Sequence, residues 1–346
     1  MTTKVAINGF GRIGRMVFKV IQERDDIEVM AINDLTDAGT LAHLLKYDSI
    51  HGRFSGDVSS KEKSIIVNGT EIPIFDIKNP SELPWKELKI DVVIESTGIF
   101  TSAEGKYGGY MSHIEAGGQK VILTVPAKDN IKTIVMGVND SDYTPDIKAV
   151  SNASCTTNCL APIVKILHDQ FGIVKGIMNT VHAFTSDQCL QDSPHKDLRR
   201  ARAASQSIIP TTTGAAKAVT LVIPDLKGKL DGMAMRVPVP NGSITDFTCE
   251  LDQSVSVEQI NGAFKEASEG TFKGIVEYTN DPIVSVDIIG NTHSSIVDAQ
   301  STMVIDNLVK VVAWYDNEVG YSNRIIDLIE LTSKAHEPQK VTAESR

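Results

Sequence analysis

Cysteine is scarce in this chain, with four residues among 346. So few thiols in so long a chain are not a disulfide framework. Cys155 and Cys159 have zinc-like spacing, but Cys189 and Cys249 stand alone, so a four-ligand metal site is not expected. We therefore predict that the protein holds no metal. We also predict a cytoplasmic location, in which a reactive thiol would stay reduced.

Long apolar runs and an excess of positive charge are also missing. No apolar run reaches membrane-spanning length, and the N-terminus lacks the charged and apolar segments of a signal peptide. The 34 Lys and Arg residues are outnumbered by 44 Asp and Glu, and the net charge of −10 argues against a general nucleic-acid-binding surface. The basic run 195–202 is more typical of a solvated or interface face than of a nucleic-acid patch. Neither a membrane nor a nucleic acid is an expected partner.

The glycine pattern near the N-terminus is the first positive signal. Lys4–Asn8 reads as a short buried strand, residues 9–14 form a G-x-G-x-x-G, and apolar residues at helical spacing follow. A second strand, Ile27–Asn33, ends at Asp34. In this setting the glycines allow a tight turn close to a pyrophosphate, the helix N-terminus stabilises its charge, and the acid accepts hydrogen bonds from a ribose diol. The segment predicts a dinucleotide site, and the carboxylate favours NAD over NADP.

The second signal is the segment Ser151–Cys159 in the middle of the chain. Ser154 and the hydroxyl residues after it can cap and start a helix, which would place Cys155 at the positive end of the helix dipole. A helix N-terminus or a nearby imidazolium, here that of His182, helps to form the nucleophilic thiolate. A buried structural cysteine would explain the same pattern, and this stretch alone does not separate the two interpretations.

The first half of the chain alternates apolar strands with helical stretches. Nearly continuous apolar runs at Ile90–Glu95, Val121–Val125 and Thr133–Val138 are typical of parallel strands covered on both faces. An Asn-Gly pair within residues 61–75 predicts a hairpin. We predict an α/β, Rossmann-type doubly wound parallel sheet. The turn at 96–98 could face a cofactor at the carboxyl edge of that sheet.

The second half of the chain differs in character. Its strand-like segments are longer and richer in Thr and Ser, at Gly176–Ala183, Gly232–Val239, Ile244–Leu251 and Val309–Tyr315. They predict an α+β domain with a largely antiparallel sheet. Helical periodicity follows at Ser322–Thr332.

Five segments together resemble phosphorylating glyceraldehyde-3-phosphate dehydrogenase of the bacterial type. They occur in the family's order and spacing, and the resemblance extends from Lys4 to about Lys334. The segments are Asn8–Arg15, Ser151–Asn158, Pro210–Lys217, Met235–Pro238 and Trp314–Ser322.

The resemblance implies two domains and a homotetramer. An NAD-binding Rossmann domain would span 1–153 and a catalytic domain 154–316, with a C-terminal helix of about 317–334 returning to the first domain. The polar, proline-containing tail 335–346 is expected to be disordered. The stretch 188–202 resembles the loop that lines a neighbour's cofactor site in this family.

The resemblance also implies a reaction. D-glyceraldehyde 3-phosphate would be oxidised to 1,3-bisphosphoglycerate with reduction of NAD, through a thioester on Cys155. His182 would be the ion-pair partner of the thiolate and the general base. Without the resemblance, a histidine satisfied within the core would be the preferred interpretation of this residue. Inorganic phosphate, a second substrate, would attack the thioester.

The site residues divide into two binding sets. Those expected to bind the cofactor are Gly9, Gly11, Arg12, Ile13, Gly14, Asp34, Thr97, Thr124 and Asn317. Those matching the family's phosphate positions are Thr185 and Arg236 for the substrate phosphate, Ser154, Thr156, Thr213 and Gly214 for the attacking phosphate, and Arg200 for either. Guanidinium forks, hydroxyls and backbone N–H groups suit these anions.

Two segments leave alternatives open. Ser193 stands where NAD-specific bacterial members often have Leu and some NADP users have a small polar residue, so strictness for NAD stays undecided. Ala203–Pro210 resembles the erythrose-4-phosphate dehydrogenase type, which oxidises its aldehyde without phosphate. The intact segment 211–217 favours the phosphorylating enzyme over that alternative.

Overall fold

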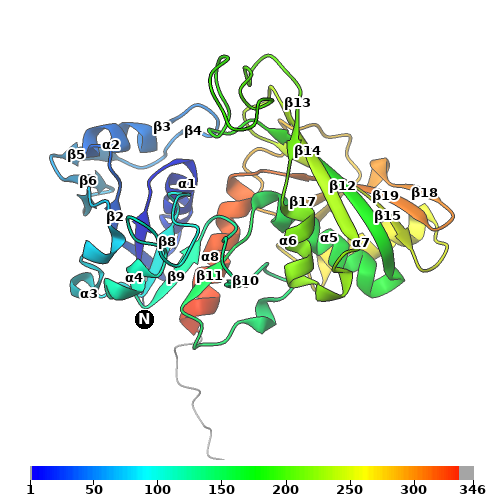
Figure 1. Ribbon diagram of the computed structural model, residues 1–346, viewed down its shortest axis with the longest axis horizontal. Helices are drawn as coiled ribbons and strands as arrows, with labels where there is room; N and C mark the ends of the chain where they lie inside the picture. Colours follow the sequence, from blue (N-terminus) through cyan, green and yellow to red (C-terminus); the bar gives the residue numbers. More distant parts are fainter. Residues whose placement is uncertain (1, 335–346) are drawn as a thin grey trace, which may run out of the picture.

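A computed structural model describes residues 2–334 of the chain. Two sheets lie on either side of the C-terminal helix, which runs between them (Figure 1). The tail 335–346, expected to be disordered, lies outside the described residues.

The first half contributes a nine-stranded sheet in the order β10-β11-β9-β8-β1-β2-β7-β6-β5. Its strands pair in parallel from β10 to β7, and β7-β6-β5 is antiparallel. The elements are β1 (Thr3–Asn8), α1 (Arg12–Ile21), β2 (Ile27–Asn33), α2 (Ala38–Lys46), β3 (Tyr47–Asp48), β4 (Gly52–Arg53), β5 (Val58–Lys61), β6 (Ser64–Val67), β7 (Thr70–Phe75), η1 (Pro80–Glu82), α3 (Trp85–Leu88), β8 (Val92–Glu95), α4 (Ser112–Glu115), β9 (Lys120–Leu123), β10 (Lys132–Thr133), η2 (Asp140–Asp142) and β11 (Ala149–Ser151).

The second half contributes an eight-stranded sheet, β13-β14-β12-β15-β19-β17-β16 with β18 beside β19. Most pairs are antiparallel, and β12·β14 and β16·β17 are parallel. The elements are α5 (Cys155–Phe171), β12 (Ile173–Ala183), β13 (Ile209–Thr212), α6 (Ala215–Val222), η3 (Pro224–Leu226), β14 (Leu230–Val237), β15 (Ser243–Leu251), α7 (Val257–Glu269), β16 (Val276–Thr279), β17 (Ser295–Asp298), η4 (Ala299–Ser301), β18 (Met303–Ile305), β19 (Leu308–Tyr315) and α8 (Val319–Lys334).

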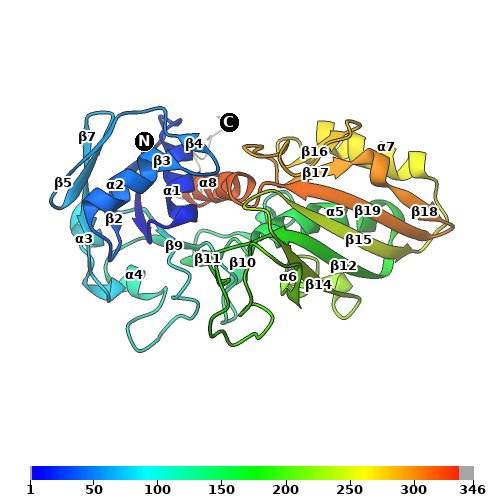
Figure 2. The same ribbon diagram turned by 90° about the horizontal axis from the view of Figure 1, so that it is seen from above.

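Both faces of the first sheet are buried, as continuous apolar strands require. Val5 and Ile7 of β1 face a core shared with α1, α2 and α8, while Ala6 between them faces the cluster around Trp85 and Tyr110. Helices α1 and α8, from opposite ends of the chain, lie side by side (Figure 2). The predicted α/β and α+β architecture is confirmed.

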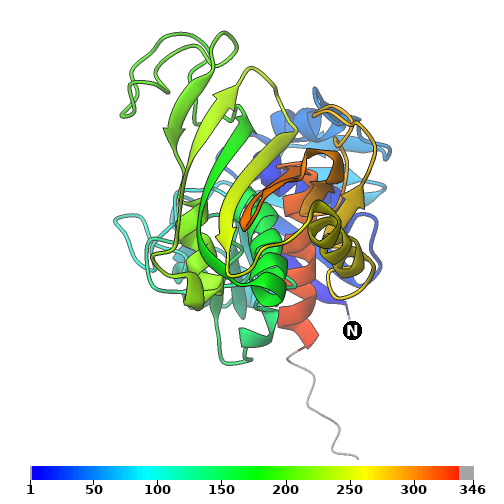
Figure 3. The ribbon, with the colours of Figure 1, turned by 90° about the vertical axis from the view of Figure 1, so that its right-hand side faces the viewer.

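The second sheet is covered by helices on one face. Helix α5 packs against both α6 and α7, and all three helices pack against its strands (Figure 3). Ile177 of β12 and Met233 of β14 remain 68% and 38% exposed. Exposed apolar side chains on neighbouring strands leave part of this sheet available to a partner.

One expected strand is largely a turn. Strand pairing at Thr133–Val138 stops at Thr133, and Gly137 has φ +79°. The Asn139 amide takes the place of a neighbouring strand, because its Oδ1 accepts from Val135 N and its Nδ2 donates to Thr133 O. The apolar pattern 134–138 therefore reflected burial and not an extended ladder.

Candidate active site

The carboxyl edge of the parallel sheet brings three chain segments together. Strand β1 pairs with β2 and β8 so that Asn8 lies opposite both Asn33 and Glu95. The chain leaves each strand at this level. The glycine turn, Asp34 and the 96–98 turn consequently start side by side.

The glycines of the first turn are required by close backbone contacts. Gly9 has φ +94°, and a Cβ there would lie 2.6 Å from Thr97 N. A Cβ on Gly14 would lie 2.2 Å from the carbonyl oxygen of Gly9, so helix α1 packs directly on the turn. A Cβ on Gly11 would meet nothing within 4 Å, which leaves open space where a ligand's phosphates can approach the backbone.

Helix α1 begins at Arg12 and has no capping side chain at Gly11. The first-turn N–H groups, including those of Arg12 and Ile13, are therefore available to an anion. The Arg12 guanidinium itself is engaged elsewhere: it donates to Glu318 and lies 3.2 Å from Asp48. Hydrogen bonds from Arg12 and His51 hold the pKa of Glu318 below its usual range despite its burial. Arg12 thus contributes its backbone to the turn and its side chain to a link with the start of α8.

Asp34 is tied to the glycine turn. Its Oδ2 accepts a 2.7 Å hydrogen bond from Phe10 N, and its Oδ1 accepts from Thr36 N at 3.0 Å. The carboxylate is therefore held beside the turn in a defined orientation, with lone pairs left over for a diol.

The remaining cofactor candidates are buried or half-buried and hydrogen-bonded. Thr97 donates through its backbone N, at 2.9 Å, and its hydroxyl to Glu95 Oε1. Thr124 donates through its hydroxyl to Glu95 O at 3.2 Å. Asn317 Oδ1 accepts from Ser243 Oγ at 2.9 Å, which leaves its amide nitrogen available to a ligand carbonyl.

Cys155 is the first residue of α5. Ser154 is the N-cap and its Oγ accepts from Thr157 N at 3.1 Å, while Ala153 before it has the left-handed φ of 54°. The thiol is half-buried, and its Sγ lies 3.5 Å from Nε2 of His182. The structure therefore brings together the two residues predicted to be catalytic and places the thiol at the positive end of a 17-residue helix.

Strand register brings Arg236 to the opposite side of the His182 ring. His182 and Arg236 are paired across β12 and β14, and Arg236 Nη1 lies 2.6 Å from His182 Nδ1 and 2.8 Å from Ala183 O. His182 Nδ1 is also 2.7 Å from Ala183 O. Nδ1 can donate to Ala183 O, which leaves Nε2 free to accept the thiol proton, or it can accept from Arg236 Nη1, which places the ring proton on Nε2. A proton on Nε2 would instead stabilise the thiolate.

Electrostatics place the positive charge of this site on arginine. Burial, and then Arg236, lower the pKa of His182 to about 3, so the imidazole is neutral near neutral pH. Burial raises the pKa of the Cys155 thiol, and Arg236 opposes that rise. The sequence predicted an imidazolium as the partner of the thiolate. A protonated His182 beside Arg236 would place two cations in one buried site, which is energetically unfavourable. A neutral His182 is instead suited to accept a proton.

Arg200 and several of the predicted phosphate-binding residues lie on loops. Arg200 Nε donates to Thr211 Oγ1 at 2.9 Å, and its guanidinium also pairs with Asp187. It is close enough to lower the pKa of both His182 and Arg236.

The other predicted anion-binding groups have local partners. Thr185 N donates to Gln188 Oε1 at 3.3 Å, and Thr213 Oγ1 accepts from Ala215 N at 3.2 Å. Gly214 precedes α6 without a side-chain cap, which leaves N–H groups there for an anion.

Tyr315 is a site residue that sequence reasoning missed. Its hydroxyl lies 2.8 Å from Thr156 Oγ1 and 2.9 Å from Thr180 Oγ1, and its ring meets His182 edge-on at 5.9 Å. Thr180 also donates to Ile244 O. The residue lies 159 positions from Thr156, and the packing of α5 against β19 brings the two together.

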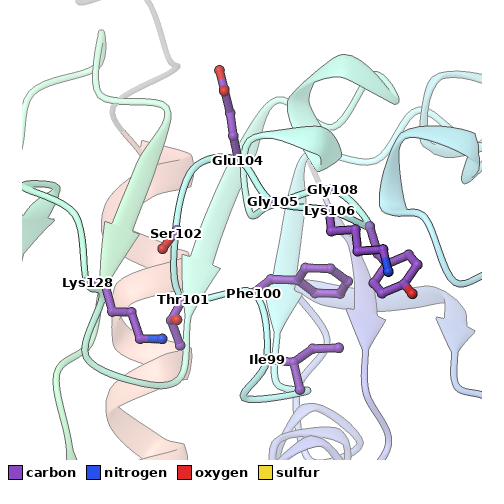
Figure 4. A pocket seen from close by; sticks show the side chains of 10 residues that line it. Ile99, Phe100, Thr101, Ser102, Glu104, Gly105, Lys106, Gly108 and Lys128 are labelled. Atoms are coloured by element: carbon purple, nitrogen blue, oxygen red, sulfur yellow. The ribbon is translucent and has the colours of Figure 1, made fainter.

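A pocket of about 280 Å³ follows directly after the Thr97 turn along the chain. Figure 4 shows Phe100 in its middle, with Lys106 and Lys128 on opposite sides. The Phe100 ring also meets His113 edge-on at 6.5 Å. The turn therefore opens onto a cavity that combines an aromatic wall with basic groups.

Two other kinds of feature are absent from the described residues. Across 2–334, no group of three or more His, Cys, Asp or Glu side chains is arranged to hold a metal ion. Within that range, no helix has the length and hydrophobicity needed to cross a bilayer.

Comparison with known proteins identifies the family. The model of the NAD binding domain of glyceraldehyde 3-phosphate dehydrogenase matches residues 3–103, and that of its C-terminal domain matches residues 154–317. The Borreliella burgdorferi glyceraldehyde-3-phosphate dehydrogenase is 62% identical over 331 residues, covering 94% of this chain and 98% of that protein. The Geobacillus stearothermophilus protein of the same name is 59% identical over 330 residues, with 95% and 97% covered. The Mycolicibacterium smegmatis protein, also of that name, is 56% identical over 343 residues, with 97% and 100% covered.

These matches confirm the predicted family and the predicted NAD cofactor. The match to the NAD binding domain lies in the half that forms the first sheet, and the match to the C-terminal domain lies in the half that forms the second. The chain belongs to the glyceraldehyde-3-phosphate dehydrogenase family.

Proposed function

We propose that this protein oxidises D-glyceraldehyde 3-phosphate with NAD and inorganic phosphate, yielding 1,3-bisphosphoglycerate and reduced NAD. The observation that carries the proposal is a thiol at the start of α5 with a neutral imidazole 3.5 Å away. Nucleophile and base lie within reach of each other, as covalent aldehyde oxidation requires. The erythrose-4-phosphate dehydrogenase-type alternative is not favoured, since the matched relatives carry the glyceraldehyde-3-phosphate dehydrogenase name.

His182 accepts a proton twice. With its ring proton on Nδ1, it first takes the thiol proton at Nε2 as Cys155 Sγ bonds to the aldehyde carbon. It passes that proton to the former carbonyl oxygen, which becomes the hydroxyl of the hemithioacetal, and takes it back as the hydride leaves. The bound dinucleotide supplies the hydride acceptor. Loss of hydride and proton leaves a thioester on Cys155. Attack by a phosphate oxygen then breaks the C–S bond, releasing the acyl phosphate and the thiolate.

Arg236 is assigned to the substrate phosphate together with Thr185. Its Nε is buried without a hydrogen-bond partner among the described residues, and its pKa is lowered by burial, so an anion would both pair with and stabilise its charge. The attacking phosphate is assigned to Ser154, Thr156, Thr213 and Gly214, with Arg200 able to serve either anion.

The cofactor is assigned to the carboxyl edge of the first sheet. The open space at Gly11 and the uncapped start of α1 fit a pyrophosphate, and Asp34 fits a ribose diol. The full set is Gly9, Gly11, Arg12, Ile13, Gly14, Asp34, Thr97, Thr124 and Asn317.

The assembly and organisation are further parts of this proposal. We assign residues 1–153 and the helix at about 317–334 to the cofactor domain, and 154–316 to the catalytic domain. The protein is proposed to be a cytoplasmic homotetramer. The exposed Ile177 and Met233 support an additional interface on the second sheet. Light scattering at micromolar concentration that returned the 37.5 kDa mass of one chain would refute the oligomer.

A steady-state assay crossing NAD with NADP, and phosphate with no phosphate, tests the reaction. We expect turnover with glyceraldehyde 3-phosphate only when NAD and phosphate are both present, because the thioester needs phosphate to leave the enzyme. Turnover that is independent of phosphate would overturn the phosphorylating assignment. Equal use of NADP would leave the reaction intact and show that Ser193, not Asp34, dominates cofactor choice.

A further inference from the structure

Three buried polar side chains end the central parallel strands. Asn8 ends β1, Asn33 ends β2 and Glu95 ends β8, and their exposed fractions are 1%, 5% and 1%. Parallel strands covered on both faces are nearly continuous runs of apolar residues. A polar layer beneath three turns is therefore a feature that needs a role.

The layer is continuous. Asn33 Nδ2 donates to Asn8 Oδ1 at 2.7 Å, and Asn8 Nδ2 donates to Glu95 Oε2 at 2.5 Å. The other carboxylate oxygen, Oε1, accepts from the backbone N and the hydroxyl of Thr97. Glu95 is thus bonded directly to one cofactor-facing turn and, through Asn8, to the strand that leads into the other.

Two buried rings fix the remaining donor. Trp85 Nε1 can only donate, and it lies 3.0 Å from His113 Nδ1, so that nitrogen is the acceptor. The proton of neutral His113 is then on Nε2, 3.0 Å from Glu95 Oε2. Both rings are fully buried. The carboxylate therefore receives donors from three residues and is held in one orientation.

The two turns also contact each other through their backbones. Ser96 Oγ donates to Gly9 O at 2.6 Å, and the space that a Cβ on Gly9 would need is taken by the backbone of Thr97. A displacement of the 96–98 turn would consequently displace the glycine turn.

We infer that Glu95 is a positioning residue for the dinucleotide: it sets the geometry of the 96–98 turn and the glycine turn without touching the ligand. The inference rests on the proposed function, because it takes both turns to bind NAD. A turn held before the ligand arrives has less freedom to lose on binding. The role predicts an effect on NAD affinity that is separate from the chemistry at Cys155.

Glu95→Gln tests the inference in the full-length protein. The amide replaces one acceptor oxygen by a donor, which must face either Thr97 or the Asn8 and His113 side of the carboxylate. Losing hydrogen bonds to a charged acceptor predicts an NAD dissociation constant raised about tenfold to a hundredfold by calorimetry. We expect kcat at saturating NAD within about threefold of wild type, because the reacting groups are untouched.

Trp85→Phe is the matched control. It removes one hydrogen bond of the same network and keeps a ring of similar shape, but it touches neither turn. We expect it to lower the melting temperature and leave NAD affinity unchanged. If both variants weaken NAD binding in proportion to their loss of stability, the role is merely structural and the inference is overturned.

A second pair decides the matter should Glu95→Gln fail to fold. His113→Leu removes a donor to Glu95 Oε2 at a residue outside the cofactor set, and His113→Gln keeps an amide donor there. Weaker NAD binding by the leucine variant with rescue by glutamine supports the inference, and wild-type affinity in both contradicts it. Wild-type protein that binds no NAD would overturn the proposed function and this inference with it. Wild-type affinity in a folded Glu95→Gln protein would overturn this inference alone.

Discussion

The two halves of the chain assemble their parts of the site in different ways. In the first half the candidate cofactor residues follow the carboxyl ends of neighbouring parallel strands, so strand order alone places them together. In the second half, Cys155 starts a helix, and His182 and Arg236 lie on paired strands. There the site depends on register, because a shift of one residue would turn a side chain to the other face.

The halves also differ in electrostatics. In the first, carboxylates are surrounded by donors: Asp34 by backbone N–H groups, Glu318 by Arg12 and His51. In the second, a guanidinium and a neutral imidazole lie together beneath a thiol. Carboxylates that are already held in place by donors can accept hydrogen bonds from a neutral diol or amide. A buried guanidinium with few hydrogen-bond partners can pair with an incoming anion. The first half is therefore suited to recognising the cofactor, and the second to charge that arrives with the substrate.

Removing the thiol should have the largest effect, because it should abolish the chemistry of the second half and leave cofactor binding by the first half unchanged. A serine hydroxyl is scarcely ionised near neutral pH, so Cys155→Ser should lower kcat by on the order of a thousandfold or more. NAD affinity, measured by calorimetry, should stay at the wild-type value because the carboxyl edge is untouched. Substantial turnover by this variant would remove Cys155 from the role of nucleophile.

Replacing the base should have the next largest effect. His182→Asn leaves the thiol without a proton acceptor and should slow acylation by roughly a hundredfold to ten-thousandfold. Stopped-flow measurement of the first turnover would report this step directly. The rate of Cys155 alkylation against pH should also change. An alkylation profile that overlays wild type would show that His182 does not contact the thiol in solution.

Replacing Asp34 tests the first half of the chain, to which the cofactor is assigned. Asp34→Ala removes one charge-assisted acceptor and the repulsion toward a 2′-phosphate, so NAD should weaken roughly tenfold to a hundredfold and the NAD:NADP preference should narrow at least about tenfold. Asp34→Asn is the matched control, because it keeps the side-chain shape that accepts from Phe10 N. The ratio of kcat/KM with NAD to kcat/KM with NADP measures the preference in each variant. If wild type already uses both cofactors, Ser193→Leu should restore the preference for NAD.

Near neutral pH the smallest effect is on stability, measured as the free energy of unfolding against pH. With the pKa of His182 near 3 in the folded state and about 6.5 when unfolded, the unfolded chain binds a proton that the folded chain does not. The free energy of unfolding should therefore fall as pH drops from about 6.5 toward 3, by at most about 1.4 kcal/mol per pH unit from this group. His182→Asn should show a shallower fall in denaturant titrations at several pH values. Parallel curves would mean that His182 keeps an ordinary pKa in the fold.

The sequence alone was enough for the features that depend on short spacing. The strand–glycine–helix pattern at 4–21, the acid at Asp34 and the helix start at Cys155 are local, and the structure has β1, α1, β2 and α5 at these places. The largely antiparallel second sheet was also predicted, from strands that are longer and richer in Thr and Ser than those of the first half. The apolar run at 134–138 was wrongly predicted to belong to a strand, because a buried turn and a buried strand can have the same amino-acid composition.

Tertiary structure alone decided the contacts between distant residues. Arg236 beside His182, Tyr315 between two threonines, and the chain from Asn33 to Glu95 and His113 each join segments far apart in sequence. Tertiary structure also decided the protonation of His182, because its pKa follows from burial and a neighbouring guanidinium, not from its own residue type. Local spacing determines which groups are present and where helices and strands begin. Register and burial determine which groups meet and what charge they carry when they do.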